Sequence, residues 1–347
     1  MPSATNMLGN RDRIQVTDGT AFMDGAVVRR MLRDSQSLLW NLDKCGYASE
    51  LTSIEKVLKG LGQHWESQHR LHQADVADYE ATATAVQQAN PHLVLNVETE
   101  CQVDHSMVDL GAIIENNITG TFYLLQTGRT HWIQLTQERR ELDCVHHISA
   151  YEEFGSLGTE GLFSENNTYR SYSANKARSV HLVNVWQHTF GLAVMHTNCS
   201  NNYFPWKFAQ KLITVVILEQ AAGEPIPLDG NGQNARDWLD MEDYEDALLL
   251  AATQGQLGHR YCVGCHEERT NKKVEEAIFQ QFNEPRLEGA AHESHNPSLI
   301  DRPAHDRRYT YNPKDIKSEL GGQSRHIFDK GRAATLCRRK RTYQTTS

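Results

Sequence analysis

The sequence has no long hydrophobic run and no excess of positive charge. No stretch of 18 apolar residues occurs in its 347 positions, and the first dozen are rich in polar residues. Neither a membrane-spanning helix nor a signal peptide is therefore expected. The formal net charge of -9 argues against general binding of polyanions. These absences predict a soluble, cytoplasmic protein without a nucleic-acid or membrane partner.

Disulfide and metal frameworks are also absent from the pattern. The seven cysteines, an odd number, are scattered over the chain, which is typical of reduced thiols. Cys262 and Cys265 alone have the spacing of a metal-ligand pair, and no second pair accompanies them. We interpret them as the end of a strand running into a glycine turn, and we predict no metal.

Short apolar segments alternate with helical periodicity along the first two hundred residues. Strands are predicted at 13–17, 37–42, 69–76, 92–97, 144–149 and 192–197, and helices follow at 26–32, 51–61, 79–89, 113–128 and 172–186. This alternation predicts an α/β fold with a Rossmann-like, doubly wound parallel sheet and a ligand at the carboxyl ends of its strands. Beyond residue 203 the pattern is less regular, apart from a helix at 241–253 and a strand at 260–263. We expect a smaller C-terminal α/β lobe there.

The turn after the first predicted strand has the position of a phosphate-binding loop. Strand, glycine-containing turn and helix form the opening of a nucleotide-binding unit, but two acids, Asp18 and Asp24, occur in this turn. Asp24 has a second interpretation as a cap of the helix. Asp43 follows the second strand, at the distance where such folds bind a ribose hydroxyl; capping of the strand end is the alternative.

The stretch from Cys144 to Lys176 contains the strongest candidates for chemistry. A buried strand delivers polar residues into a turn, and Tyr172 and Lys176 then follow four residues apart, on one face if the segment is helical. A neighbouring ammonium lowers the pKa of a phenol, so this tyrosine could act as a general base. A surface tyrosine beside a solvated lysine would give the same spacing.

Five motifs occur in order: Tyr172-Ser-Ala-Asn-Lys176, Thr197-Asn-Cys-Ser-Asn-Asn-Tyr203, Gly230-Asn-Gly-Gln233, Arg236-Asp-Trp-Leu239 and Asp301-Arg-Pro-Ala-His-Asp-Arg-Arg-Tyr309. Together they resemble the extended short-chain dehydrogenase/reductases, in the nucleotide-sugar branch that contains the dTDP-glucose 4,6-dehydratases. The likeness runs from about Arg13 to Tyr309. It implies an NAD-binding domain at 11–203, an interleaved nucleotide-sugar-binding lobe at 204–335, and a basic tail at 336–347.

The resemblance implies a hydro-lyase reaction from dTDP-glucose to dTDP-4-dehydro-6-deoxyglucose and water. Tyr172 would take the proton of the sugar O4 hydroxyl while a hydride leaves C4 for bound NAD, and Lys176 would lower the pKa of that phenol. Glu152 would remove the proton at C5. Tyr151 stands where the family has the acid that protonates the departing C6 hydroxyl. NADH would finally reduce C6.

The resemblance also implies binding residues and a homodimer. The cofactor residues would be Phe22, Met23, Asp43, Lys44, Asp75 and Val76, together with Tyr172 and Lys176. The residues near the dTDP-sugar would be Glu100, Asn201, Lys211, Leu212, Arg236, Asn271, Asp301, Arg302, Pro303 and His305.

The sequence departs from the family pattern at the cofactor turn and at the active site. Asp18, Ala21 and Asp24 replace the three fingerprint glycines, and Ala150 and Tyr151 replace a threonine and an aspartic acid. A phenol is a far weaker acid than a carboxylic acid. Two alternatives therefore stay open: a homologue that binds nucleotide sugar without turnover, and an epimerase or reductase that needs no elimination.

Overall fold

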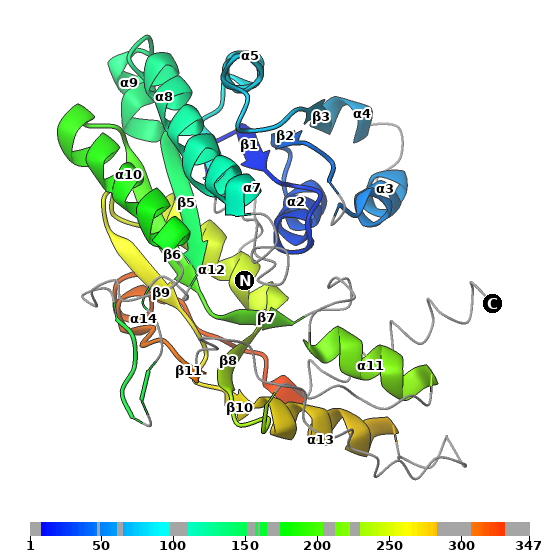
Figure 1. Cartoon of the computed structure of the whole chain (residues 1–347). Coiled ribbons are helices and arrows are strands. Elements are labelled where there is room, and N and C mark those ends of the chain that lie inside the picture. The colour runs from blue at the N-terminus through cyan, green and yellow to red at the C-terminus, as the bar shows by residue number, and fades with distance from the viewer. Residues whose placement is uncertain are drawn as a thin grey trace.

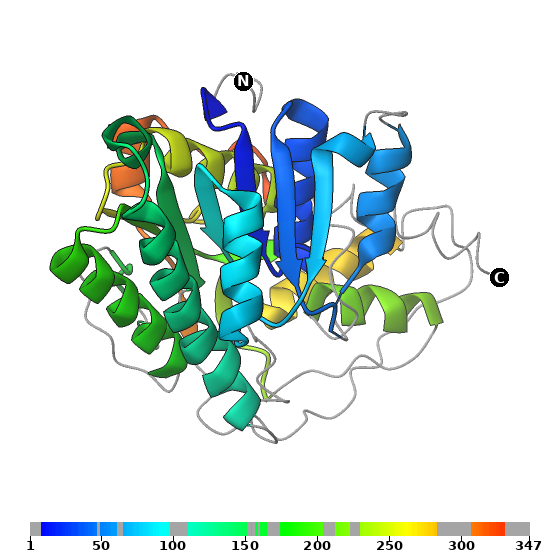
Figure 2. The ribbon, with the colours of Figure 1, turned by 90° about the horizontal axis from the view of Figure 1, so that it is seen from above.

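A computed structural model of the chain describes residues 8–46, 49–60, 65–97, 110–150, 154, 157–158, 160–164, 174–203, 212–222, 230–282 and 307–329. Two layers of helices enclose a central sheet, and a smaller lobe adjoins one end of it (Figures 1 and 2). No helix in these ranges combines the length and the hydropathy needed to cross a bilayer.

The central sheet is parallel throughout. Its strands are β1 (Arg13–Thr17), β2 (Leu38–Asp43), β3 (His69–Gln73), β4 (Leu93–Asn96), β5 (Cys144–Ala150), β6 (Val194–Cys199) and β9 (Arg260–Val263). Their order is β3-β2-β1-β4-β5-β6-β9, which confirms the predicted Rossmann-like, doubly wound sheet. The strand order reverses between β1 and β4, and such a switch point opens a crevice at the carboxyl ends of the two strands.

Helices cover both faces of the sheet. On one face lie α2 (Phe22–Asp34), α3 (Leu51–Gly60) and α12 (Met241–Gln254), and on the other α5 (Tyr79–Ala89), α8 (Thr121–Trp132) and α10 (Ala174–Phe190). Shorter helices are α4 (Trp65–Gln68), α9 (Gln137–Leu142) and α14 (Lys314–Leu320). Each face has its own cluster of buried apolar side chains, so both faces of each inner strand are covered.

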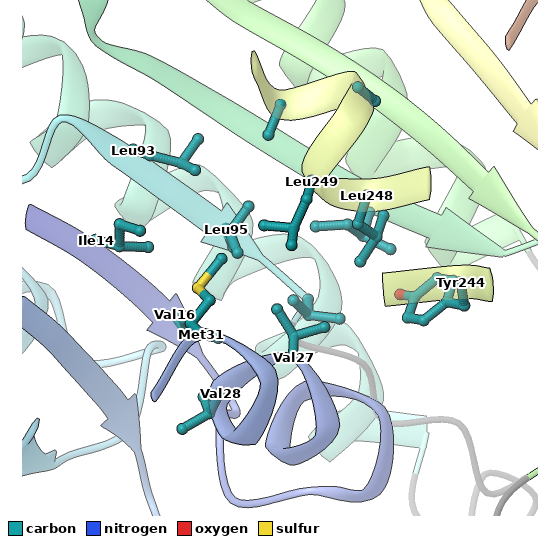
Figure 3. Packing of buried hydrophobic residues seen from close by; sticks show 14 of the residues in the cluster. Ile14, Val16, Val27, Val28, Met31, Leu93, Leu95, Tyr244, Leu248 and Leu249 are labelled. Carbon is teal, nitrogen blue, oxygen red and sulfur yellow. The ribbon is translucent and has the colours of Figure 1, made fainter. Parts of the chain in front are cut away.

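The packing between β1, β4, α2 and α12 fixes one wall of the switch point. Ile14 of β1 and Leu93 of β4 lie against Met31 of α2 and Leu249 of α12, and all four are at most 1% exposed (Figure 3). Burial of a large aliphatic side chain contributes about 1.5–3 kcal/mol to folding. The turn between β1 and α2 is therefore anchored at both ends.

The smaller lobe is built on a second sheet. Its strands are β7 (Asn201–Tyr203), β8 (Ala235–Asp240), β10 (Glu268–Thr270) and β11 (Arg308–Tyr309), with helices α11 (Leu212–Ala222) and α13 (Asn271–Phe282). The expectation of irregular chain around Arg236 was wrong, because this residue lies within β8. Its charged residues concealed the strand: Asp237, 1% exposed, accepts hydrogen bonds from the backbone N–H groups of Cys265 and Glu267.

The helix expected at 113–128 is longer and is interrupted. It comprises α7 (Leu110–Ile114), a π-helical segment η2 (Glu115–Gly120) and α8, which ends at Trp132. The π-helical segment turns Asn116 and Asn117 into the interior, where they are 3% and 2% exposed. Such π segments are frequent at functional sites. Apolar periodicity does not reveal them, because the residues on both sides keep a helical pattern.

Two buried histidines in the sheet make stability depend on pH. Burial lowers the pKa of His146 and of His196 to about 3. The unfolded chain protonates these groups below about pH 6.5, whereas the folded chain resists protonation. The stabilisation is thus complete above pH 6.5, and we expect the free energy of unfolding to fall as the pH drops towards 3, by about 1.4 kcal/mol per pH unit for each histidine.

Urea denaturation between about pH 6 and about pH 4 measures this slope. His196→Leu should reduce it by about 1.4 kcal/mol per unit. Glu245, whose pKa burial raises to about 8, contributes a slope of the opposite sign, but it is present in both proteins and cancels in the comparison. An unchanged slope in the variant would contradict the assignment.

Candidate active site

The turn after β1 keeps the backbone shape of a glycine turn although its first glycine is replaced. Asp18 has a φ of 54°, in the left-handed region, which aspartate tolerates better than most residues. Its N–H donates to the carbonyl of Leu42 (2.9 Å) and its carbonyl accepts from the N–H of Ala21 (2.9 Å). The turn is therefore closed in the conformation that a glycine at this position would allow.

Asp43 connects this turn to the end of β2. Its Oδ2 accepts hydrogen bonds from the N–H (2.8 Å) and the hydroxyl (2.6 Å) of Thr20, and its Oδ1 accepts one from the N–H of Cys45 (2.6 Å). The side chain is 2% exposed. Asp43 thus braces the turn and caps the strand end, as the alternative interpretation held, and its contact with a ribose stays a prediction.

The N-terminus of α2 lies directly after the turn. Its N-cap is Ala21, which makes no side-chain capping bond, so the interpretation of Asp24 as a cap was wrong. Asp24 is 3% exposed and belongs to the first turn of the helix. Its charge is one of the influences, after burial and Cys199, that raise the pKa of Tyr244 on α12. The side chain of the N-cap makes no bond to the first N–H groups of α2, and N–H groups at such a helix end can receive a phosphate.

Gly19 is required by close packing within this turn. A Cβ at this position would lie 2.2 Å from Oδ1 of Asn41, a side chain that is fully buried. Gly19→Ala should therefore destabilise the protein by about 1–3 kcal/mol, because the buried side chain of Asn41 would have to shift to admit the methyl group. Chemical denaturation measures the loss. Gly60→Ala in α3, where nothing lies within 4 Å of the added Cβ, is the control and should be neutral or stabilising. Equal effects of the two changes would contradict the packing argument.

The residues predicted for the adenosine end lie beyond β2 and β3. Lys44 and Asp75 form an ion pair at 4.0 Å, with both side chains more than one third exposed. Val76 is 3% exposed and packs on Gly120, the residue before α8. A Cβ added to Gly120 would lie 2.5 Å from Cγ1 of Val76. Met23 packs on the core, and for Phe22 the structure describes the backbone only.

The catalytic lysine candidate is buried at the start of α10. Lys176 is 7% exposed. Burial, together with the positive charge of Lys176, holds the pKa of His147 on β5 well below its usual range. The helix begins at Ala174. Tyr172, Glu152 and Tyr151 lie outside the described residues.

The residues predicted for the dTDP-sugar lie partly on the smaller lobe. Arg236, 8% exposed, places its guanidinium 4.4 Å from the ring centre of Tyr309, and Asn271 opens α13. Asn201 lies on β7, and Leu212 opens α11. The others, Glu100, Lys211, Asp301, Arg302, Pro303 and His305, lie outside the described residues.

Arg308 belongs to the cationic stretch at 301–309 but already has an acidic partner. Its Nε and Nη2 donate to the two carboxylate oxygens of Glu268, both at 2.6 Å. These bonds raise the pKa of the Arg308 guanidinium. Arg308 is therefore held in an ion pair, and the same two-pronged geometry is not available to a phosphate while Glu268 occupies it.

Sequence reasoning missed the polar residues that lie behind the site. Asn96, at the end of β4, and His147 on β5 are paired across the sheet and joined by a 3.0 Å hydrogen bond. Each is 1% exposed. The signal was available as polar residues inside otherwise apolar strands. Only the register of the sheet shows that they meet.

Comparison with known proteins agrees with this geometry. The model of the family described as GDP-mannose 4,6 dehydratase matches residues 16–335. A dTDP-glucose 4,6-dehydratase of Neisseria meningitidis is 37% identical over 332 residues, covering 93% of this chain and 92% of the relative. One from Escherichia coli K12 is 36% identical over 336 residues, covering 93% and 91%.

Solved structures of the same class superpose on the chain. A dTDP-glucose 4,6-dehydratase of Streptomyces venezuelae, solved with NAD bound, has a TM-score of 0.84 and 26% identity, and covers 96% of this chain and 98% of its own. A UDP-glucose 4-epimerase of Thermotoga maritima has a TM-score of 0.81 at 15% identity over 95% and 99% of the two chains, which shows the fold alone. With the family match extending over most of its length, the chain belongs to the GDP-mannose 4,6 dehydratase family.

Proposed function

We propose that this protein is a nucleotide-sugar 4,6-dehydratase that converts dTDP-glucose to dTDP-4-dehydro-6-deoxyglucose and water with NAD as its cofactor. The observation that carries the proposal is the 36–37% identity to dTDP-glucose 4,6-dehydratases over more than nine tenths of the chain. The buried lysine of a Tyr-x-x-x-Lys motif supports it, as does a phosphate-compatible turn at the switch point of the sheet.

The cofactor site is formed by the β1–α2 turn and the ends of β2 and β3. The N-terminus of α2 would hold the pyrophosphate, while Asp43, Lys44, Asp75 and Val76 would surround the adenosine. NAD, when bound, supplies a hydride acceptor for C4 and a hydride donor for C6. The Lys176 ammonium, on the opposite side of the switch point, would hold the nicotinamide ribose.

Side chains of this protein would carry out the proton transfers. Tyr172 would take the O4 proton, because the Lys176 charge favours its phenolate, and a 4-keto group would then acidify C5. Glu152 would remove the C5 proton. Tyr151 would have to deliver a proton to the departing C6 hydroxyl, with a phenol of ordinary pKa about 10, so elimination is the step that this sequence supports least.

A binding protein without turnover is the second candidate, and one observation favours it. Ala150 and Tyr151 replace a hydrogen-bond donor and a strong acid at the elimination site. The substrate side of the site would survive in such a protein. An epimerase shares the fold, but the likeness to the epimerase structure at 15% identity carries no argument about its reaction.

One experiment separates these candidates. Purified protein is incubated with dTDP-glucose in deuterated water, with and without added NAD, and the sugar is followed by NMR. A 4-keto-6-deoxy product deuterated at C5 establishes oxidation and elimination together. Broadened sugar signals without product favour the binding protein, and a C4 epimer that keeps its C6 hydroxyl favours the epimerase.

The homodimer and the cytoplasmic location stay predictions, and an apolar surface supports the first. Helices α8 and α10 lie side by side on the outside of the sheet (Figures 1 and 2). Phe122 and Val185 are 38% and 47% exposed on them, and Phe122 packs edge-on against Trp186 at 5.4 Å. A second copy that buries this surface would form a symmetric interface from two helices of each subunit.

Charge placed on this surface should separate the subunits. Val185→Glu is expected to shift the protein from dimer to monomer in sedimentation velocity, because a carboxylate would be buried unpaired in the interface. Ile327→Glu is the control, since Ile327 is 50% exposed but follows α14, next to Phe328 in the core of the smaller lobe. A wild-type monomer, or a Val185→Glu dimer, would refute the assignment of this surface.

A further inference from the structure

A chain of hydrogen bonds runs behind the switch point from β1 towards α10. At its start, the N–H of Val97 donates to Oγ1 of Thr17 (3.1 Å), and Oγ1 of Thr17 donates to Oδ1 of Asn96 (3.1 Å). Thr17 is the last residue of β1, immediately before the cofactor turn. Any displacement of that turn therefore moves the first link.

The chain continues through His147 with a defined direction. Nδ2 of Asn96 lies 3.0 Å from Nδ1 of His147, and an amide nitrogen can only donate, so Nδ1 is the acceptor. The ring proton is then on Nε2, which lies 3.3 Å from Oγ of Ser179. That hydroxyl in turn donates to the carbonyl of Lys176 (2.8 Å). Each donor in this series of hydrogen bonds thus has an acceptor.

All of these groups lie in the dry interior. Thr17 and Ser179 are fully buried, Asn96 and His147 are 1% exposed, and Lys176 is 7% exposed. Water cannot replace a broken link at such sites, and a buried polar group left without a partner is costly. Burial, the Lys176 charge and the neighbouring His196, His146 and Arg260 all keep His147 neutral. The neutral ring, with one donor and one acceptor, is the form that this series of hydrogen bonds requires.

We propose that His147 is a positioning residue for Lys176, and that Thr17, Asn96, His147 and Ser179 form a relay that couples the cofactor turn to the first turn of α10. Its catalytic consequence rests on the proposed function. Lys176 lies in the third position of α10, so the orientation of its peptide decides where its ammonium points. A relay that fixes this peptide fixes the distance from the ammonium to the phenol and to the ribose.

Ser179→Ala is the sharpest test, because Ser35→Ala is a matched control. Both hydroxyls are buried and both donate to a backbone carbonyl at 2.8 Å, but Ser35 ends α2 at the opposite edge of the sheet. The two variants should lose similar stability in urea. In the full-length enzyme assayed with saturating NAD, Ser179→Ala should lower kcat about 10- to 100-fold with little change in KM, whereas Ser35→Ala should leave kcat unchanged.

The pH profile distinguishes positioning from general weakening. A displaced ammonium favours the phenolate less, so the acid limb of kcat should move to higher pH in Ser179→Ala and in His147→Leu. His147→Gln, which keeps a donor near the place of Nε2, should retain more activity than His147→Leu. A Ser179→Ala profile that superposes on those of wild type and Ser35→Ala would overturn the proposal.

A second measurement needs no turnover. In the protein labelled with 15N-histidine, the signals that His147→Gln removes should report an Nε2–H tautomer from pH 8 to pH 5, and Ser179→Ala should shift them. Amide exchange at the first turn of α10 should be faster in Ser179→Ala than in Ser35→Ala. An Nδ1–H tautomer, or equal exchange, would overturn the relay. A wild-type protein that does not convert dTDP-glucose would refute the proposed function alone, and these readouts would still decide the inference.

Discussion

Lys176→Met is expected to lower the rate of sugar oxidation by about two to four orders of magnitude, the range in which a positioned acid or base contributes. Lys176 is 7% exposed, so water screens its charge little, and we expect this charge to have a large effect on the phenol of Tyr172. Methionine has a similar length and a good helix propensity. The start of α10 should therefore survive the loss of charge.

The measurement is kcat for dTDP-glucose as a function of pH. The variant should recover part of its activity as the pH approaches the ordinary pKa of a tyrosine, about 10, because the phenolate then forms without help from the lysine. Lys59→Met is the control, since Lys59 is exposed on α3 in an i,i+4 pair with Glu55. Because Lys176 would also hold the cofactor, the affinity for NAD is measured separately. A variant with wild-type kcat at saturating NAD would exclude Lys176 from the chemistry.

The sheet could be predicted closely because its strands are short and apolar on both faces. The predicted strand at 13–17 and the strand at 260–263 coincide with β1 and β9, and the helix at 79–89 coincides with α5. Three prolines (Pro205, Pro225 and Pro227), a glycine-rich turn and charged residues hid the second sheet, in which β8 places polar side chains inward. A pattern of apolar alternation cannot find a strand whose buried residues are charged and paired.

Candidate site residues could be predicted only where the local sequence pattern indicates a role. Tyr172 and Lys176 are four residues apart, and Asp43 ends a strand, so spacing made them candidates, and their roles stay predictions. The relay through Asn96 and His147 was not predicted, because a buried histidine in a strand reads as a core residue until the register is known. The pairing of Asn96 with His147, and of His147 with His196, arises from three segments separated by about fifty residues each.

The replaced acid at the elimination site gives the second large expected effect. Ala150→Thr combined with Tyr151→Asp should raise the rate of C6 elimination by about 10²-fold or more, because a carboxylic acid of ordinary pKa about 4 replaces a phenol of about 10 as the proton donor. Ala150 ends β5, and its carbonyl accepts a hydrogen bond from Nδ2 of Asn198 (3.3 Å). The strand therefore holds the backbone on which the threonine hydroxyl would be presented.

The two steps of the reaction can be scored apart in this variant. Oxidation at C4 is followed by the absorbance of NADH in a single turnover, and elimination by the appearance of the 4-keto-6-deoxy sugar. If the double variant oxidises at the wild-type rate and eliminates faster, the missing acid limits the natural enzyme. If both rates stay as they were, elimination is not limited by Tyr151, and the weak point lies in the turn where Asp18, Ala21 and Asp24 replace glycines. NAD affinity would then be the quantity to restore, by Asp24→Gly, which removes a carboxylate from the first turn of the helix proposed to receive the pyrophosphate.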